Sequence, residues 1–242
     1  MIIDGHVRIG TGRDVALTVD DLLSTMDELG IDAALVAPGE REIAVANRDG
    51  NTATTDAAKR AEALHAYAVA NPWRAEALED LARARDAGAV ALAVDSVLQG
   101  FDLLDGLVDP LIEFAGEAGW PVYVRTGTPP NALPLPLATL ARRYPEIPFL
   151  MGRSGATDFW IDAAPAMRHA PNLYADTCYA PWDTVLTELR ADARIGAGRM
   201  FFSTDAPYTV PRAEVARITD WPIDDADRAA VLGTNLQALL GK

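Results

Sequence analysis

The chain has 242 residues, of which 50% are hydrophobic and 23% are charged. This length and composition fit one sizeable α/β domain over residues 1–242 better than two small domains. The formal net charge is −14, and the sequence contains no segment rich in Lys or Arg. Nucleic acid and membrane partners are therefore not expected, because both present anionic surfaces.

The chain opens on Met1 to Asp4 without the basic stretch, apolar core or small-residue cleavage site of a secretory signal. No apolar stretch reaches the length of a membrane span. The single cysteine, Cys178, excludes an internal disulfide and a structural zinc site built from several thiolates. We expect a cytoplasmic protein.

Short apolar runs alternate with longer segments of helical period along the chain, which is typical of repeated βα units. The expected strands cover residues 2–6, 31–36, 66–70, 89–94, 121–125, 147–152, 172–177 and 200–204. Helices are expected over residues 19–29, in the second half of 40–64, after Pro72, over 103–118, 137–144, 161–169 and 184–194, and then up to Leu240. Eight strands with interleaved helices predict a (β/α)₈ TIM barrel.

Five charged or titratable side chains fall at the ends of expected strands. They are His6, Arg8, Arg125, Arg153 and Asp205. In a (β/α)₈ barrel the catalytic groups lie at the carboxyl ends of the strands, so we expect these five side chains at one mouth. A guanidinium carries five donors, no acceptor and a permanent positive charge, so the three arginines can bind anions but not metal cations.

Spacing by two along a strand places side chains on the same face. Asp4, His6 and Arg8 share a face by this rule, and so do Tyr123 and Arg125. We therefore expect Tyr123 to contribute to substrate binding beside Arg125.

Six motifs occur in order along nearly the whole chain. They are residues 2–8 (IIDGHVR), 122–127 (VYVRTG), 151–155 (MGRSG), 171–177 (PNLYADT), 202–207 (FSTDAP) and 235–240 (NLQALL). Together they resemble the amidohydrolase superfamily, in particular its amidohydrolase-2 branch, which also holds decarboxylases of small aromatic acids and lactonases. The resemblance implies a TIM barrel, and it implies a homodimer because dimers are common in this superfamily.

The resemblance also implies a mononuclear metal held by histidines of the first strand, a later histidine and a terminal aspartate. Of these ligands the sequence keeps only His6 and Asp205, whereas Arg8, Arg125 and Arg153 stand where histidines are expected. Two ligands do not hold a catalytic metal, so we expect neither a metal nor another cofactor.

Two functions remain open. The first is a metal-independent hydrolase or lactonase in which the arginines hold a small carboxylated substrate while Asp205 and His6 move a proton. It resembles lactonases of pyrone dicarboxylates, and a lyase, isomerase or cyclase reaction fits the same groups. The second is an inactive binding or scaffold protein, in which buried carboxylates such as Asp4, Asp176 or Asp205 neutralise the arginines.

Overall fold

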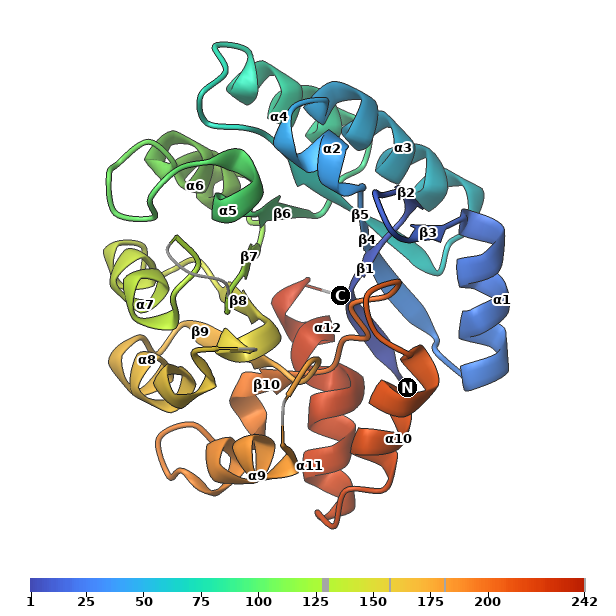
Figure 1. Cartoon of the computed structure of the whole chain (residues 1–242), viewed down its shortest axis with the longest axis vertical. Helices are drawn as coiled ribbons and strands as arrows, with labels where there is room; N and C mark the ends of the chain where they lie inside the picture. The colour runs from blue at the N-terminus through green and yellow to red at the C-terminus, as the bar shows by residue number, and fades with distance from the viewer. Residues whose placement is uncertain (128–130, 157, 181, 242) are drawn as a thin grey trace.

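The computed structural model describes residues 1–127, 131–156, 158–180 and 182–241. Eight parallel strands form one sheet whose order in space follows the chain (Figure 1). They are β1 (Ile3–Arg8), β4 (Ala33–Ala37), β5 (Leu64–Val69), β6 (Ala91–Val94), β7 (Val122–Arg125), β8 (Phe149–Gly152), β9 (Leu173–Asp176) and β10 (Met200–Phe201).

Backbone hydrogen bonds between β1 and the segment that follows β10 close the ring. The N–H of Gly5 donates to the carbonyl of Phe202 at 2.9 Å, and the N–H of Asp205 donates to the carbonyl of His6 at 3.0 Å. The predicted (β/α)₈ TIM barrel is therefore confirmed.

Helices surround the barrel on its outside (Figure 1). They are α1 (Val19–Leu29), α2 (Glu40–Ala44), α3 (Asn47–Arg60), α4 (Ala77–Asp86), α5 (Ser96–Gln99), α6 (Asp109–Glu117), α7 (Pro134–Arg143), α8 (Ala163–His169), α9 (Asp183–Ala191), α10 (Pro211–Thr219), α11 (Asp225–Ala229) and α12 (Asn235–Leu239). Short helical turns cover η1 (Arg153–Gly155), η2 (Trp160–Asp162), η3 (Ala197–Arg199) and η4 (Ala230–Thr234), and a hairpin joins β2 (Gly10–Thr11) to β3 (Ala16–Leu17).

The first helix has the bounds that its sequence predicts. The Thr18 side chain accepts a hydrogen bond from the N–H of Asp21, which caps the helix start. Gly30 ends the helix in the left-handed conformation at φ 67°, where a residue without Cβ meets no steric penalty. Leu22 and Met26 are buried between these ends, so one face of the helix packs against the barrel.

Several expected elements differ from the structure. The helix expected to open at Pro72 starts only at Ala77. The helix expected over 103–118 starts only at Asp109, and the separate helix α5 precedes it, capped by the Asp95 side chain. Residues 40–64 contain two helices, and Leu64 already belongs to β5. The strand expected to reach Thr204 ends at Phe201, because the N–H of Thr204 donates to the Asp4 side chain at 2.9 Å instead of continuing the sheet.

Apolar side chains fill the barrel interior as well as the layer between strands and helices. The interior cluster includes Ile3, Tyr67, Tyr123 and Phe201 from four strands, and Leu236 of α12 packs against it. The barrel is thus a packed core that supports the groups at the strand ends, as expected of this fold.

Candidate functional site

The carboxyl ends of the strands bring the predicted charged residues to one end of the barrel. Arg8 is the last residue of β1 and Arg125 the last of β7, while Arg153 directly follows β8. Asp205 follows β10, and His6 lies within β1. Side-chain contacts join these residues into two groups.

The first group is a chain of contacts through Asp205. The Arg153 guanidinium reaches Asp205 Oδ2 through Nε at 2.8 Å and Nη2 at 2.6 Å. The other carboxylate oxygen, Oδ1, lies 3.1 Å from Nδ1 of His6. Asp205 and His6 are 0% and 1% exposed, so a fully buried carboxylate joins a cation to an imidazole.

Electrostatics fix the protonation of this chain. Burial by itself favours the neutral form of Asp205, but the hydrogen bond from His6 and the charge of Arg153 lower its pKa to about 2. Burial lowers the pKa of His6 to about 4, against the opposing effect of Asp205. Near neutral pH, Asp205 is therefore ionised and must accept from His6, so the imidazole carries its proton on Nδ1 and has a free lone pair on Nε2.

The second group is centred on Asp95, a residue that the sequence analysis missed. Asp95 Oδ2 accepts from Arg8 Nη2 at 3.0 Å and from Arg125 Nη1 at 3.4 Å. Burial favours the neutral carboxyl, yet the charges of Arg8 and Arg125 outweigh it and lower the pKa of Asp95. Asp95 directly follows β6, so the strand-end rule that selected the arginines could have found it.

Two donors of this second group have no hydrogen-bond partner among the described residues. They are the Nε atoms of Arg8 and Arg125, both buried. The Arg8 side chain is 4% exposed and that of Arg125 is 17% exposed. An unpaired donor of a buried charged group is costly, and native proteins leave few of them. Both atoms could donate to an anion.

Tyr123 lies next to His6 inside the barrel. Its ring stacks on the His6 ring, with centroids 4.0 Å apart and an angle of 1° between the planes. The residue is 1% exposed, and no described group bonds to its buried hydroxyl. In the structure, Tyr123 is thus placed to support His6 from inside the barrel.

Two other tyrosines contact the guanidiniums. Arg153 lies over the ring of Tyr179 at 4.3 Å and near that of Tyr208 at 5.6 Å. Arg8 lies 5.5 Å from the Tyr208 ring, so this ring has a guanidinium from each group as a neighbour. Tyr208 belongs to none of the predicted site residues, although it follows β10 closely.

Left-handed backbone conformations cluster at this end of the barrel. Among the described residues other than glycine, φ is positive at Arg153 (60°), Ser154 (45°), Tyr179 (59°) and Asp205 (51°). All four follow the ends of β8, β9 or β10. Such conformations are disfavoured for residues with a side chain, and they concentrate at functional sites.

Buried carboxylates hold these backbone segments. Asp176 accepts from the N–H of Arg153 at 3.2 Å and from the hydroxyl of Ser203 at 2.7 Å. It also accepts from the N–H and the thiol of Cys178. Burial raises the pKa of Asp176 to about 6 and the pKa of the Cys178 thiol well above its usual value.

Asp4 plays the matching role next to Asp205. It accepts from the N–H of His6 at 3.2 Å and from the N–H of Thr204, and the Thr204 hydroxyl also donates to it. Burial raises its pKa to about 7. Of the three carboxylates suggested as partners of the arginines, Asp205 pairs with a guanidinium. Asp4 and Asp176 accept hydrogen bonds from backbone N–H, hydroxyl and thiol groups instead. The carboxylate that pairs with Arg8 and Arg125 is Asp95.

No group of three or more His, Cys, Asp or Glu side chains that could hold a metal occurs in the described part of the chain. In the same part, no helix is long and apolar enough to cross a membrane.

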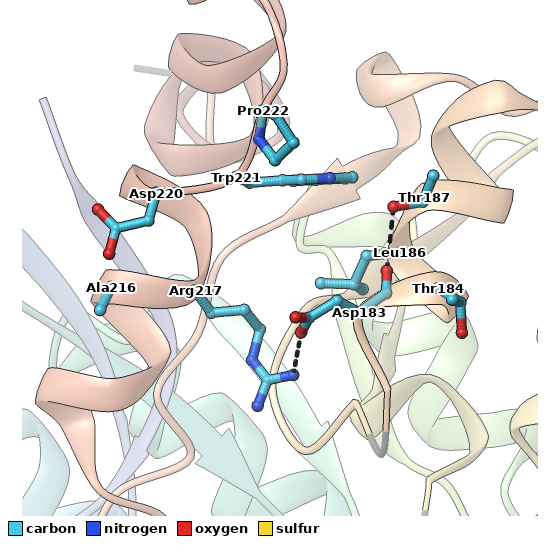
Figure 2. Close-up of a pocket in the computed structure, with 9 residues that line it drawn as sticks. All are labelled: Asp183, Thr184, Leu186, Thr187, Ala216, Arg217, Asp220, Trp221 and Pro222. Atoms are coloured by element: carbon cyan, nitrogen blue, oxygen red, sulfur yellow. Dashed lines mark hydrogen bonds and ion pairs between the residues drawn. The ribbon is translucent and has the colours of Figure 1, made fainter.

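A surface groove lies elsewhere, between α9 and α10 on the outside of the barrel (Figure 2). Its volume is about 500 Å³, and Leu186 and Trp221 are among the residues that line it. Arg217 donates to Asp183 across the groove at 3.1 Å. None of its lining residues belongs to the two groups at the barrel mouth.

Solved structures similar to this chain share its fold. A 2,6-dihydroxybenzoate decarboxylase from Rhizobium superposes with a TM-score of 0.76 at 17% identity, covering 99% of this chain and 98% of the other. A 5-carboxyvanillate decarboxylase from Novosphingobium aromaticivorans, complexed with manganese and 4-hydroxy-3-methoxy-5-nitrobenzoic acid, gives 0.81 at 15% identity, covering 100% and 96%. A probable 2-pyrone-4,6-dicarboxylic acid hydrolase from Acinetobacter baumannii, with citric acid bound, gives 0.75 at 13% identity, covering 100% and 99%.

No curated protein matches the chain. The profile of the amidohydrolase family, in its amidohydrolase-2 form, matches residues 8–242. This match covers nearly all of the sequence and both groups of charged residues except His6. The chain therefore belongs to the amidohydrolase family.

Proposed function

We propose that this protein is a metal-independent enzyme that acts on a small carboxylated substrate. The observation that carries the proposal is the pair of buried Nε donors on Arg8 and Arg125, which lack partners among the described residues. A carboxylate is the natural ligand of paired guanidinium N–H groups. Arg125 is the more exposed of the two and offers the first contact to an incoming anion.

Proton transfer falls to His6 in this proposal. Its neutral ring has a free lone pair on Nε2, while the ionised Asp205 holds Nδ1–H and stabilises the imidazolium that forms when Nε2 takes a proton. Arg153 keeps Asp205 ionised, so the aspartate orients the base instead of acting as the base. Stacking of Tyr123 on the ring keeps the imidazole in one plane.

A divalent metal does not fit the same residues. His6 Nδ1 and both oxygens of Asp205 are engaged by protein groups, and the Arg153 guanidinium lies 2.6 Å from Oδ2. A cation at this carboxylate would have to displace the guanidinium or face its charge. The related 5-carboxyvanillate decarboxylase contains manganese, so this chain would depart from that protein in its chemistry.

The similar structures support the class of substrate. One carries the name of a 2,6-dihydroxybenzoate decarboxylase, and another that of a probable 2-pyrone-4,6-dicarboxylic acid hydrolase. Both names specify a small carboxylated ring as the substrate, whereas a decarboxylase and a hydrolase cleave different bonds. We therefore propose the anionic substrate for this chain and leave hydrolysis, decarboxylation or another lyase, isomerase or cyclase reaction open.

Thermal unfolding with 2,6-dihydroxybenzoate tests the binding site. At about 100 times its Kd, a ligand stabilises a protein by roughly 2.7 kcal/mol, which raises the Tm of a chain of this size by about 5–10 °C. Arg8→Ala and Arg125→Ala should lose most of this rise, while the exposed Arg194→Ala should keep it. If the rise in Tm survives in both variants, the two arginines do not hold the anion. Stoichiometric zinc, manganese or iron in the purified protein would contradict the metal-free site.

One observation favours an inactive binding or scaffold protein as a second candidate. Asp205 is 0% exposed and both of its oxygens are bonded, so nothing about this carboxylate requires a substrate. Anion-dependent stabilisation without turnover of any small carboxylate would select this candidate. Turnover would reject it.

A further inference from the structure

Asp95 sets the net charge of the pair formed by Arg8 and Arg125. Both guanidiniums contact the same oxygen, Oδ2, at 3.0 and 3.4 Å. Asp95 therefore cancels one of the two positive charges while drawing the two cations together. Arg153 is matched separately by Asp205.

The position of Asp95 is fixed from the other side. Its Oδ1 accepts from the N–H of Leu98 at 3.1 Å, which caps the short helix α5, and its own N–H donates to the Gln99 side chain. Asp95 is only 2% exposed. A carboxylate anchored in this way does not swing aside to leave both guanidiniums free for ligands.

We propose that Asp95 is the specificity-determining residue of the mouth and limits the Arg8–Arg125 pair to one substrate carboxylate. With Asp95 in place, the pair carries one uncompensated charge and two unpaired Nε donors, which suits a single carboxylate. A second carboxylate on the same substrate ring would face the negative charge of Asp95 and would find no further cation without a partner. The free-energy cost of removing this carboxylate from water would therefore not be offset. This inference rests on the proposed function, because it assumes that the pair binds a carboxylate.

The charge of Asp95 can be removed with little change of shape. Asparagine is nearly isosteric with aspartate and remains a good helix cap, so Asp95→Asn should keep the bond from Leu98. The pair would then carry two uncompensated charges. The double variant D95N/R125Q would return it to one.

Calorimetric titration with benzoate and isophthalate, which differ by one carboxylate on the same ring, tests the proposal. The native protein should bind benzoate at least as tightly as isophthalate. Asp95→Asn should shift the ratio of the two affinities toward isophthalate by at least tenfold, and D95N/R125Q should restore the native ratio. Asp80→Asn is the matched control, because it removes one charge from another buried acid that pairs with Arg48 away from the mouth.

The outcomes separate this inference from the proposed function. If neither the native protein nor Asp95→Asn binds benzoate or isophthalate, the anion site itself is rejected. If the native protein binds benzoate but Asp95→Asn leaves the ratio unchanged, or binds neither ligand, the charge limit alone is wrong. Should Asp95→Asn fail to fold, the native ratio still decides, since isophthalate bound more than tenfold tighter than benzoate would overturn the inference.

Discussion

At the scale of single residues, the site depends on which atom carries each proton. Asp205 stays ionised next to Arg153, and His6 stays neutral because it is buried. A neutral histidine held through Nδ1 is oriented as a base, whereas a carboxylate with a pKa near 2 is a weak one. The sequence assigned proton transfer to Asp205 and His6 together, and in the proposed mechanism His6 is the base while Asp205 orients it.

Replacing Asp205 by asparagine tests this division of roles. Asp205→Asn keeps the shape but removes the charge that fixes the His6 tautomer and stabilises the imidazolium. For a small carboxylate that the protein converts, we expect kcat to fall by about 10²–10⁴-fold, the usual range for a proton-transfer group. Binding should change much less, and Asp80→Asn should retain its activity. Unchanged turnover in Asp205→Asn would remove this residue from the mechanism.

At the scale of elements, the end of β8 leaves room for the Tyr123 ring, which stacks on His6. A Cβ at Gly152 would overlap the ring and hydroxyl of Tyr123, and the same Tyr123 ring stacks on the His6 ring. The small residue in β8 and the large one in the neighbouring strand β7 therefore fit together, although the register partner of Gly152 is Arg125. The lack of a side chain at Gly152 is what allows the tyrosine to lie flat beneath the imidazole.

Gly152→Ala should for this reason disturb both stability and the site. Overpacking of a filled core costs about 1–3 kcal/mol, so the free energy of unfolding measured in urea should be lower in the variant by that amount. Gly198→Ala is a matched control, because a Cβ there meets no atom within 4 Å. If the two variants lost equal stability, the effect would lie in the glycine backbone and not in the contact with Tyr123.

The same elements show how far the sequence leads. Alternating apolar runs and helical segments predicted the barrel, and the strand-end rule placed three arginines at its mouth because each is the end of, or follows, a buried strand. The pairing of Arg8 with Arg125 through Asp95 could not be predicted, since β1 lies far from β6 and β7 in the chain and is not their neighbour in the sheet. Spacing assigned Tyr123 to the face of Arg125, and the structure adds that its ring stacks on His6 in space that Gly152 leaves open, while its contact with substrate stays a prediction.

At the scale of the whole molecule, the first and last strands are tied together. Backbone bonds join β1 to the segment after β10, and the His6–Asp205 contact lies on the same seam. We therefore propose that residues 1–242 form one domain, which should unfold in a single transition. One cooperative transition allows the buried titratable groups to be treated together as contributions to a single free energy of unfolding.

Those groups predict that the protein becomes less stable as the pH rises from weakly acidic to neutral. Burial raises the pKa of Asp4 to about 7, of Asp176 to about 6 and of Glu214 to about 7. Between their ordinary values near 4 and these values, the folded protein holds protons that the unfolded chain has released, so rising pH favours unfolding. His6 acts in the opposite sense, because its folded pKa of about 4 lies below the unfolded 6.5, but it is one group against three.

Asp4→Asn isolates one of these contributions, because asparagine resembles the protonated carboxyl but cannot ionise. Each such group changes the free energy of unfolding by up to about 1.4 kcal/mol per pH unit. In the variant, the free energy of unfolding should therefore fall less steeply between roughly pH 4.5 and 6.5, with a slope smaller by up to this amount. Urea unfolding of both proteins across this range measures the slopes, with Asp14→Asn, whose side chain is 84% exposed, as the control. A native protein whose stability instead rises steadily toward pH 7 would mean that the buried carboxyls are ionised in the folded state. Asp4 and Asp176 would then hold the backbone beside Arg153 and Asp205 as charges and not as neutral hydrogen-bonding groups.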